Sequence, residues 1–234
     1  MKATLEARVE ALAGLETPAV ARFDRDEALQ GRWAVLPSAF NPPTRAHLRL
    51  LDLALGVEGV EGGAALLTTR NVAKGLEGAS LGDRIGMLLA ARASRPGLAV
   101  LAANQARIAD QGAALRATWP GATFDFVLGY DTLVRLFNDQ YYDGPMESVL
   151  DPFFECHRVV ATNRGEVSVA DMEAWVAERA SRYAARIITL GLDEEHGRMA
   201  SSKARARIGA GAGSDDVPAE VAAYIREHGL YAGG

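Results

Sequence analysis

The chain has 234 residues, of which 49% are hydrophobic and 24% charged, with a formal net charge of −5 and a pI near 5.5. This charge gives no electrostatic basis for binding nucleic acid or an anionic membrane, so neither is an expected partner. No apolar stretch approaches the roughly 20 residues that a membrane-spanning helix requires. The single cysteine leaves no internal disulfide, and the N-terminal residues lack the apolar core of a signal peptide. We therefore expect a cytoplasmic globular protein.

Two kinds of segment alternate along the chain. Residues 1–16 have the pattern of an amphipathic helix. Short apolar runs that predict strands follow at 33–37, 63–69, 98–103, 124–129, 158–163 and 186–191, and stretches with helical spacing lie at 44–56, 81–94, 106–118, 131–137 and 171–184. Runs that are apolar on both sides are typical of parallel strands covered by helices on both faces. The alternation predicts an α/β fold with a doubly wound, Rossmann-like, mainly parallel sheet.

The end of the chain has a different pattern. From residue 201 it predicts a short helix, a turn rich in glycine, alanine and serine, and a second helix that begins near Pro218. We expect an N-terminal helical extension (1–30), an α/β domain (31–200) and a small C-terminal helical part of the same domain (201–234). Ligands of such sheets lie at the carboxyl ends of strands. We therefore expect the ligand-binding residues in the segments 38–47, 70–74, 129–131 and 163–164.

The stretch PSAFNPPTRAHL, residues 37–48, joins the first long strand to its helix. Its two prolines favour an extended backbone before the helix begins. Thr44 and His47 then lie three residues apart on one face of the first turn, where unpaired N–H groups and the helix dipole favour a phosphate. In the alternative interpretation, Thr44 only caps the helix and His47 is a surface residue.

This stretch resembles the signature G-S-F-N-P-x-[HT]-x-x-H of the nicotinamide mononucleotide adenylyltransferase family. Two positions depart from the signature, because Ser38 stands for its first glycine and Ala39 for its serine. The resemblance implies adenylyl transfer from ATP to nicotinamide mononucleotide or nicotinic acid mononucleotide, which yields a dinucleotide such as NAD and pyrophosphate. It makes His47 and Thr44 catalytic, and places Ser38, Ala39 and Phe40 at the phosphates of ATP.

Further matches follow in the family's order. FVLGYDTL resembles its G-x-D-x-L motif, which places Gly129 and Asp131 at adenosine, although Asp131 could equally be an N-cap. TTRNVAKGLEGASLGDR resembles a segment whose loop lysine, here Lys74, binds the phosphate of the acceptor; Lys74 could also be a solvated loop cation. Arg84 matches an arginine of the next helix, for which we expect a structural role. RVVATNRGE resembles a late strand that ends in a polar-Arg-Gly turn, which places Asn163 and Arg164 at the acceptor.

MASSKARARI resembles the signature I-S-S-T-x-x-R. Ser201 and Ser202 match it, and Lys203 replaces the threonine. The resemblance assigns all three to the phosphates of ATP. Because the arginine fits only with a gap of one residue, Arg205 is the expected catalytic arginine and Arg207 is its rival.

The family has a tryptophan that stacks on nicotinamide, and this chain has none in the matching region. Phe137 or Tyr141 is expected to stack on the acceptor instead, with Tyr142 as a further candidate, although these residues could also be core. For Phe153 and Phe154 we expect core positions.

The resemblance also implies Mg²⁺ that is bound mainly through ATP, with no metal site built from protein side chains. ATP and a mononucleotide are the expected partners, and a homo-oligomer is left open. No G-x-x-x-x-G-K-[ST] stretch indicates a P-loop, and no G-x-G-x-x-G follows the first strand. Two alternatives stay open: a nucleotidyltransferase with another phosphate acceptor, and a non-catalytic nucleotide-binding regulatory protein.

Overall fold

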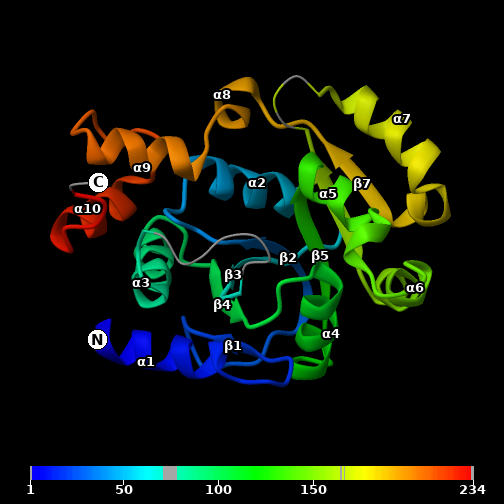
Figure 1. Ribbon diagram of the computed structural model, residues 1–234, viewed down its shortest axis with the longest axis horizontal. Helices are drawn as coiled ribbons and strands as arrows, with labels where there is room; N and C mark the ends of the chain where they lie inside the picture. The colour runs from blue at the N-terminus through cyan, green and yellow to red at the C-terminus, as the bar shows by residue number, and fades with distance from the viewer. Residues whose placement is uncertain (1, 71–77, 164, 166, 233–234) are drawn as a thin grey trace.

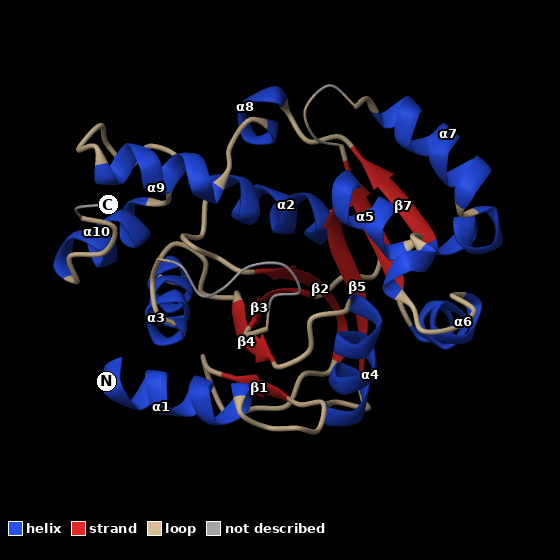
Figure 2. Ribbon diagram, viewed as in Figure 1, coloured by secondary structure: helices blue, strands red, loops and turns tan. Residues whose placement is uncertain are grey.

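A computed structural model describes residues 2–70, 78–163, 165 and 167–232. Its centre is a seven-stranded sheet with the order β1-β4-β3-β2-β5-β6-β7 (Figures 1 and 2). Only the pairing of β1 with β4 is antiparallel. The strands are β1 (Val20–Arg22), β2 (Gly31–Ser38), β3 (Gly62–Thr68), β4 (Ala99–Ala103), β5 (Ala122–Gly129), β6 (Arg158–Thr162) and β7 (Ile187–Leu190).

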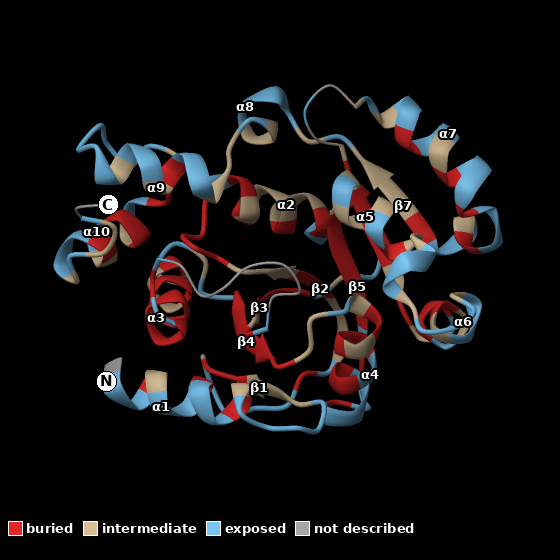
Figure 3. Cartoon of the chain, viewed as in Figure 1, coloured by how far each residue is buried: buried red, intermediate tan, exposed pale blue. Residues whose placement is uncertain are grey.

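Helices cover both faces of the sheet. Along β3 the side chains alternate between two cores, with Ala65 and Leu67 in one and Ala64 and Leu66 in the other, as the two-residue period of a strand requires. In Figure 3 the strands are largely buried, while the outer surfaces of the helices are exposed. The first core is covered by α1 (Lys2–Ala13), α2 (Arg45–Leu55), α3 (Leu81–Ala91), α9 (Ser201–Gly209) and α10 (Ala219–Glu227), and the second by α4 (Ile108–Thr118), α5 (Tyr130–Leu136), α6 (Glu147–Cys156) and α7 (Val169–Arg179).

The predicted alternation of strands and helices is confirmed, and so is the mainly parallel sheet. Among the β-strands and α-helices of the described residues, the sequence analysis missed three: β1, α6 and the short helix α8 (Glu194–Gly197). Strand β1 and helix α8 are too short to show a period, and Pro152 inside α6 obscures a helix whose apolar face buries Leu150, Phe153 and Phe154. The last two residues are core, as expected. Because β1 pairs with β4, residues 1–30 contain more than the predicted helix, while the division at 30 and 200 stays a prediction.

No helix in the described part of the chain is long and apolar enough to cross a membrane.

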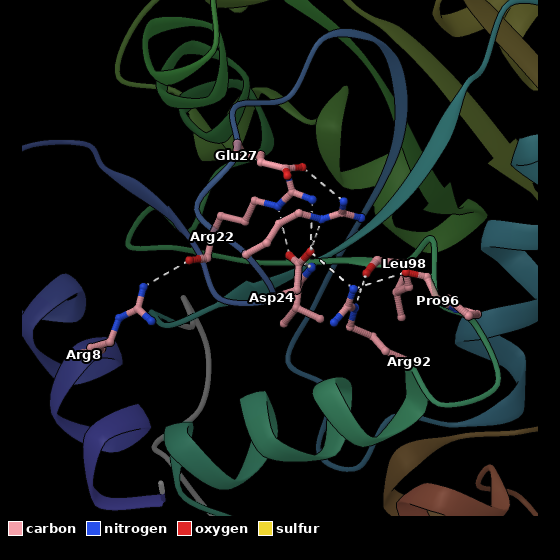
Figure 4. A network of polar contacts seen from close by, with 9 residues as sticks. Arg8, Arg22, Asp24, Glu27, Arg92, Pro96 and Leu98 are labelled. Carbon is pink, nitrogen blue, oxygen red and sulfur yellow. Dashed lines mark hydrogen bonds and ion pairs between the residues drawn. The ribbon is translucent and has the colours of Figure 1, made fainter.

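At the β1 edge of the sheet, the fold is held by a network around Asp24, whose side chain is fully buried (Figure 4). Both carboxylate oxygens of Asp24 accept hydrogen bonds from Arg22 at 3.0 Å, and one also accepts from the Val100 backbone N–H at 2.9 Å. Arg92 of the next layer lies 3.8 Å away. The network therefore ties the segment after β1 to β4.

We expect the substitution Asp24→Asn to lower the free energy of unfolding by about 3 kcal/mol, because it leaves the mostly buried Arg22 without its charge partner. Burial alone would raise the pKa of Asp24, but hydrogen bonds from Arg22 and the Val100 N–H hold it below its ordinary value. The carboxylate therefore stabilises the fold above about pH 4, and this stabilisation is lost as the pH falls through the folded-state pKa.

Urea unfolding at several pH values measures this effect. The difference between wild type and Asp24→Asn should shrink as the pH falls below about 4. Asp26→Asn is the matched control, because Asp26 is exposed. A loss of stability in the control equal to that in Asp24→Asn would contradict the prediction.

Candidate nucleotide site

A cavity of about 280 Å³ lies at the carboxyl ends of the central strands β2, β5 and β6. Its remaining walls come from the first turns of α2, the start of α5 and the segment 192–201 that follows β7. The sequence analysis expected ligands at four segments that follow strands, and three of these segments contribute residues to the cavity: 38–47, 129–131 and 163–164. Seven predicted site residues line this one cavity: Ser38, Thr44, His47, Gly129, Asp131, Asn163 and Ser201.

His47 is held in a defined orientation at the start of α2. The Thr44 backbone N–H donates to Nδ1 of His47 at 3.0 Å, and the Thr44 hydroxyl lies 2.7 Å from the same atom. Because a backbone N–H can only donate, Nδ1 must accept, and the proton of the neutral ring is on Nε2. That Nε2–H points to the Ser38 hydroxyl at 3.2 Å. The cavity is therefore lined by a histidine that is a hydrogen-bond donor.

The loop between β2 and α2 is fixed by side chains that are distant in sequence. Arg84 of α3 donates to the Ala39 carbonyl at 3.3 Å, Arg205 of α9 donates to the Asn41 carbonyl, and the Ser201 hydroxyl donates to the Pro42 carbonyl at 2.8 Å. Between these anchors Phe40 has a φ of +43°, which is unusual for a residue with a side chain. Its buried ring lies 5.1 Å from the imidazole of His47.

The side chain of Asn41 connects the same loop to the C-terminal segment. Its Oδ1 accepts a hydrogen bond from the Ala79 N–H at 3.2 Å and another from the Tyr231 hydroxyl at 2.8 Å. Burial raises the pKa of Tyr231, so this hydroxyl keeps its proton and donates. Gly78 has a φ of +87°, and a Cβ there would stand 2.7 Å from the Asn41 amide nitrogen. The loop, α3 and the end of the chain are thus packed as one unit.

Gly129 and Asp131 lie where β5 ends. No described protein atom is within 4 Å of the place where a Cβ of Gly129 would stand, so packing inside the protein does not require glycine there. The N-cap of α5 is Gly129, and Asp131 is an exposed residue of the first turn. The alternative interpretation of Asp131 as the N-cap is therefore wrong. Its carboxylate lines the cavity as a hydrogen-bond acceptor.

Asn163, at the end of β6, positions the segment that closes the cavity. Its Oδ1 accepts a hydrogen bond from the Leu192 N–H at 2.6 Å. From Leu192 the chain passes over the cavity to Ser201, which contacts Pro42. The closing segment is therefore attached at both ends.

The predicted phosphate residues of α9 point in different directions. Ser201 lines the central cavity, Ser202 and Arg205 line a second cavity of about 770 Å³, and Lys203 and Arg207 line a third depression of about 320 Å³. Successive residues of a helix are rotated by about 100°, which is why the side chains of these neighbours line different surfaces. Arg207 is paired with Asp215 and Asp216 at 3.3 and 3.5 Å.

Some predicted site residues do not line the central cavity. Phe137 packs in an aromatic cluster with Phe154, Trp175 and Tyr183, and Tyr141 is exposed on the surface. Ala39 and Phe40 belong to the β2–α2 loop, where the Ala39 carbonyl accepts from Arg84 and the Phe40 ring packs near His47. Lys74 and Arg164 lie outside the described residues.

The sequence analysis missed one residue of the cavity wall, His196, and the residue that orients it, Asp193. His196 of α8 lines the cavity, and its Nδ1 lies 2.6 Å from a carboxylate oxygen of Asp193. The hydrogen bond with the imidazole lowers the pKa of Asp193 to about 2. Arg49 of α2 contacts the other oxygen at 3.4 Å. The sequence signal was weak, because the spacing of Asp193 and His196 is only that of an ordinary helix cap.

Among the described residues, no three His, Cys, Asp or Glu side chains are grouped so that they could hold a metal ion. The polar side chains that line the cavity carry hydroxyl, imidazole and amide groups, together with the carboxylate of Asp131. This chemistry suits a polar organic ligand that carries an anionic group.

Comparison with known proteins gives similarity in sequence and in fold. No family model matches the chain. A protein of Schizosaccharomyces pombe named "Putative nicotinamide mononucleotide adenylyltransferase" is 29% identical over 134 residues. The aligned part is 56% of this chain and spans only about half of that relative, 52% of its length.

Two solved structures have a similar fold. One is the Plasmodium falciparum nicotinic acid mononucleotide adenylyltransferase complexed with NaAD, with a TM-score of 0.64 and 16% identity over 86% of this chain and 97% of that one. The other is the same enzyme complexed with APC, with a TM-score of 0.60 and 14% identity over 86% and 98%. At these identities the likeness concerns the fold, and it confirms the Rossmann-like α/β class. The chain resembles the nicotinamide and nicotinic acid mononucleotide adenylyltransferases in its motifs, in 134 aligned residues and in its fold.

Proposed function

We propose that this protein transfers the adenylyl group of ATP to the phosphate of a mononucleotide, either nicotinamide mononucleotide or nicotinic acid mononucleotide. The observation that carries the proposal is the donor Nε2–H of His47, which lines a cavity together with Ser38, Thr44 and Ser201. Hydrogen-bond donors grouped at a helix N-terminus are suited to phosphate oxygens. The curated relative and the two structural neighbours carry names with this activity.

In the proposed arrangement the α-phosphate lies at His47 and Thr44. The remaining phosphates pass over the N-terminus of α9, where Ser201 faces the first cavity and Ser202 and Arg205 face the second. The exposed N–H groups of the first turn of α9 add further donors. Lys203 is directed away from this path and would act only through its charge.

The adenosine would occupy the region of Gly129 and Asp131, where the carboxylate accepts hydrogen bonds from ribose hydroxyls. Lys74 and Arg164 are assigned to the acceptor by the motif resemblance alone. Asn163, which precedes Arg164 in sequence, lines the cavity, and its Oδ1 accepts a hydrogen bond from the Leu192 N–H. The packing of Phe137 and the position of Tyr141 give no support to either as the stacking residue.

The reaction would be an in-line displacement at phosphorus. An oxygen of the acceptor phosphate forms a bond to the α-phosphorus of ATP, the bond to the bridging oxygen breaks, and pyrophosphate leaves with the electron pair. The attacking oxygen is already anionic, so no protein base is required. The role of this chain is to position the two phosphates and to stabilise negative charge with donors that are already oriented.

Magnesium would accompany ATP as part of the substrate, held by its phosphates and by water. We assign the protein to the cytoplasm, on the composition alone. If ATP binds but neither mononucleotide reacts, the acceptor is a different phosphate or the protein is a nucleotide-binding regulator.

We expect His47→Ala to lower kcat by about 100-fold or more, because it removes a donor to the charge that develops in the transition state. Pyrophosphate release is measured with ATP, Mg²⁺ and either mononucleotide. His228→Ala is the control, because His228 contacts the Tyr224 carbonyl on α10 and not the cavity. Release that is independent of the acceptor, or that persists in His47→Ala, would sink the proposal, and the faster acceptor identifies the substrate.

Arg205 and Arg207 are distinguished by their positions. We expect Arg205→Ala to raise the KM for ATP about tenfold, because it removes both a candidate phosphate contact and the hydrogen bond to the Asn41 carbonyl. Arg207→Ala should stay near wild type, since Arg207 is half-exposed and is already paired with the carboxylates of Asp215 and Asp216. Steady-state kinetics with varied ATP measures both, and a larger effect of Arg207→Ala would reverse the assignment.

A further inference from the structure

Two histidines line the central cavity, and their ring nitrogens are used in opposite ways. In His47, Nδ1 accepts from the Thr44 N–H, which leaves the proton on Nε2. In His196, Nδ1 faces a carboxylate of Asp193, and a carboxylate can only accept. The proton of neutral His196 is therefore on Nδ1, and its Nε2 carries a lone pair. One histidine is thus a donor and the other an acceptor.

While its ring is neutral, Nε2 of His196 cannot donate a hydrogen bond to a phosphate oxygen, because both atoms carry lone pairs. It needs a partner with an N–H or O–H group. The cavity wall around it includes Leu50 of α2, Leu192 and Met199, which are apolar and suit a flat ring. The side chain of His196 is only 17% exposed, so an unmatched group opposite its nitrogen would be poorly solvated. These features fit a heterocyclic base better than an anion.

The order of the strands gives the direction in which a nucleotide would lie. Phosphates at Ser38 would be at the end of β2, and the ribose at Asp131 would be at the end of the neighbouring β5. Beyond β5 come β6 and β7, so the base would lie toward the segment 192–197. Strands are about 4.8 Å apart, so three spacings provide roughly 14 Å from β2 to β7. His196 belongs to the segment that closes this end.

We propose that His196, oriented by Asp193, reads the base of the donor nucleotide and selects a purine with an amino group at position 6 over one with a carbonyl group. This inference rests on the proposed function, since it requires a nucleoside triphosphate in this cavity. The 6-amino group of adenine donates to Nε2 of His196, whereas the 6-carbonyl of hypoxanthine or guanine would place a second lone pair against it. Asp193 is a positioning residue that acts by holding the proton on Nδ1, and Arg49 fixes its carboxylate from α2.

The test compares ATP with inosine triphosphate, whose base carries a carbonyl at position 6 and a proton on N1, where adenine has an amino group and an unprotonated N1. Binding by calorimetry and pyrophosphate release are measured at about pH 8, above the range in which histidine side chains ordinarily titrate. Wild type should favour ATP about tenfold or more in both measurements. The triphosphate of purine riboside has only hydrogen at position 6. Its affinity and its rate of pyrophosphate release should lie between those of ATP and inosine triphosphate.

His196→Phe keeps a flat ring of similar shape and removes the acceptor. This variant should bind ATP more weakly than wild type does, and it should bind inosine triphosphate equally well or better. The preference for ATP should therefore fall to about twofold or less. Asp193→Asn should also reduce the preference, because an amide can donate to Nδ1 and permit the other tautomer. The matched controls are His228→Phe, away from the cavity, and Glu194→Gln, a neutralised acid on the same helix; both should keep the wild-type preference.

The outcomes separate the two proposals. Equal affinity of wild type for ATP and inosine triphosphate overturns the role of His196, whatever the variants do. The role of His196 is also overturned if His196→Phe keeps the wild-type preference for ATP, or if it loses affinity for ATP and inosine triphosphate equally. In either case, turnover with ATP would leave the proposed function intact. Failure of wild type to bind either nucleotide would overturn both proposals.

Discussion

The backbone of the β2–α2 loop imposes the constraint on which the rest of the site depends. Its carbonyl groups belong to neither strand nor helix, and buried carbonyls need donors. Arg84, Arg205 and Ser201 supply these donors from two helices far away in sequence, and Asn41 adds a link to Tyr231 at the end of the chain. The loop that leads into α2 and His47 therefore has its geometry only when α3, α9 and the C-terminal segment are all in place. This explains why residues beyond 200 are structurally part of a site that begins at residue 38.

The two histidines of the cavity show how neighbouring groups decide what a side chain can do. A backbone N–H on Nδ1 makes His47 a donor, and a carboxylate on Nδ1 makes His196 an acceptor. The same residue type thus suits a phosphate at one end and an amino group at the other. The sheet separates these two ends by the strands β2, β5, β6 and β7, because α2 follows β2 and α8 follows β7.

Most of the fold could be predicted, because short runs that are apolar on both sides and helical stretches of period 3.6 are local properties of the sequence. Elements were missed where the local signal is short or interrupted, as in β1, α8 and the proline-containing α6. For the site, the motif residues Ser38, Thr44 and His47 were predicted to lie together, and they do. The motif of α9 was less informative, since the rotation between successive helical residues sends Ser201, Ser202 and Lys203 to three different surfaces. Phe137 was a reasonable candidate for stacking by its position in sequence, but its ring packs against other aromatic rings.

The sequence by itself determined the α/β class, the strand ends at which polar residues gather, and the resemblance of its motifs to one family. These follow from periodicity and from residue types at short spacing, which need no knowledge of distant contacts. Only the tertiary structure decided which arginine supports the loop, which serine faces the cavity and that His196 lies in its wall. Asn41 and Tyr231 are 190 positions apart, and Asn41 and Arg205 are 164 apart. Such contacts depend on how the helices pack on the sheet, and no local pattern of the sequence encodes them.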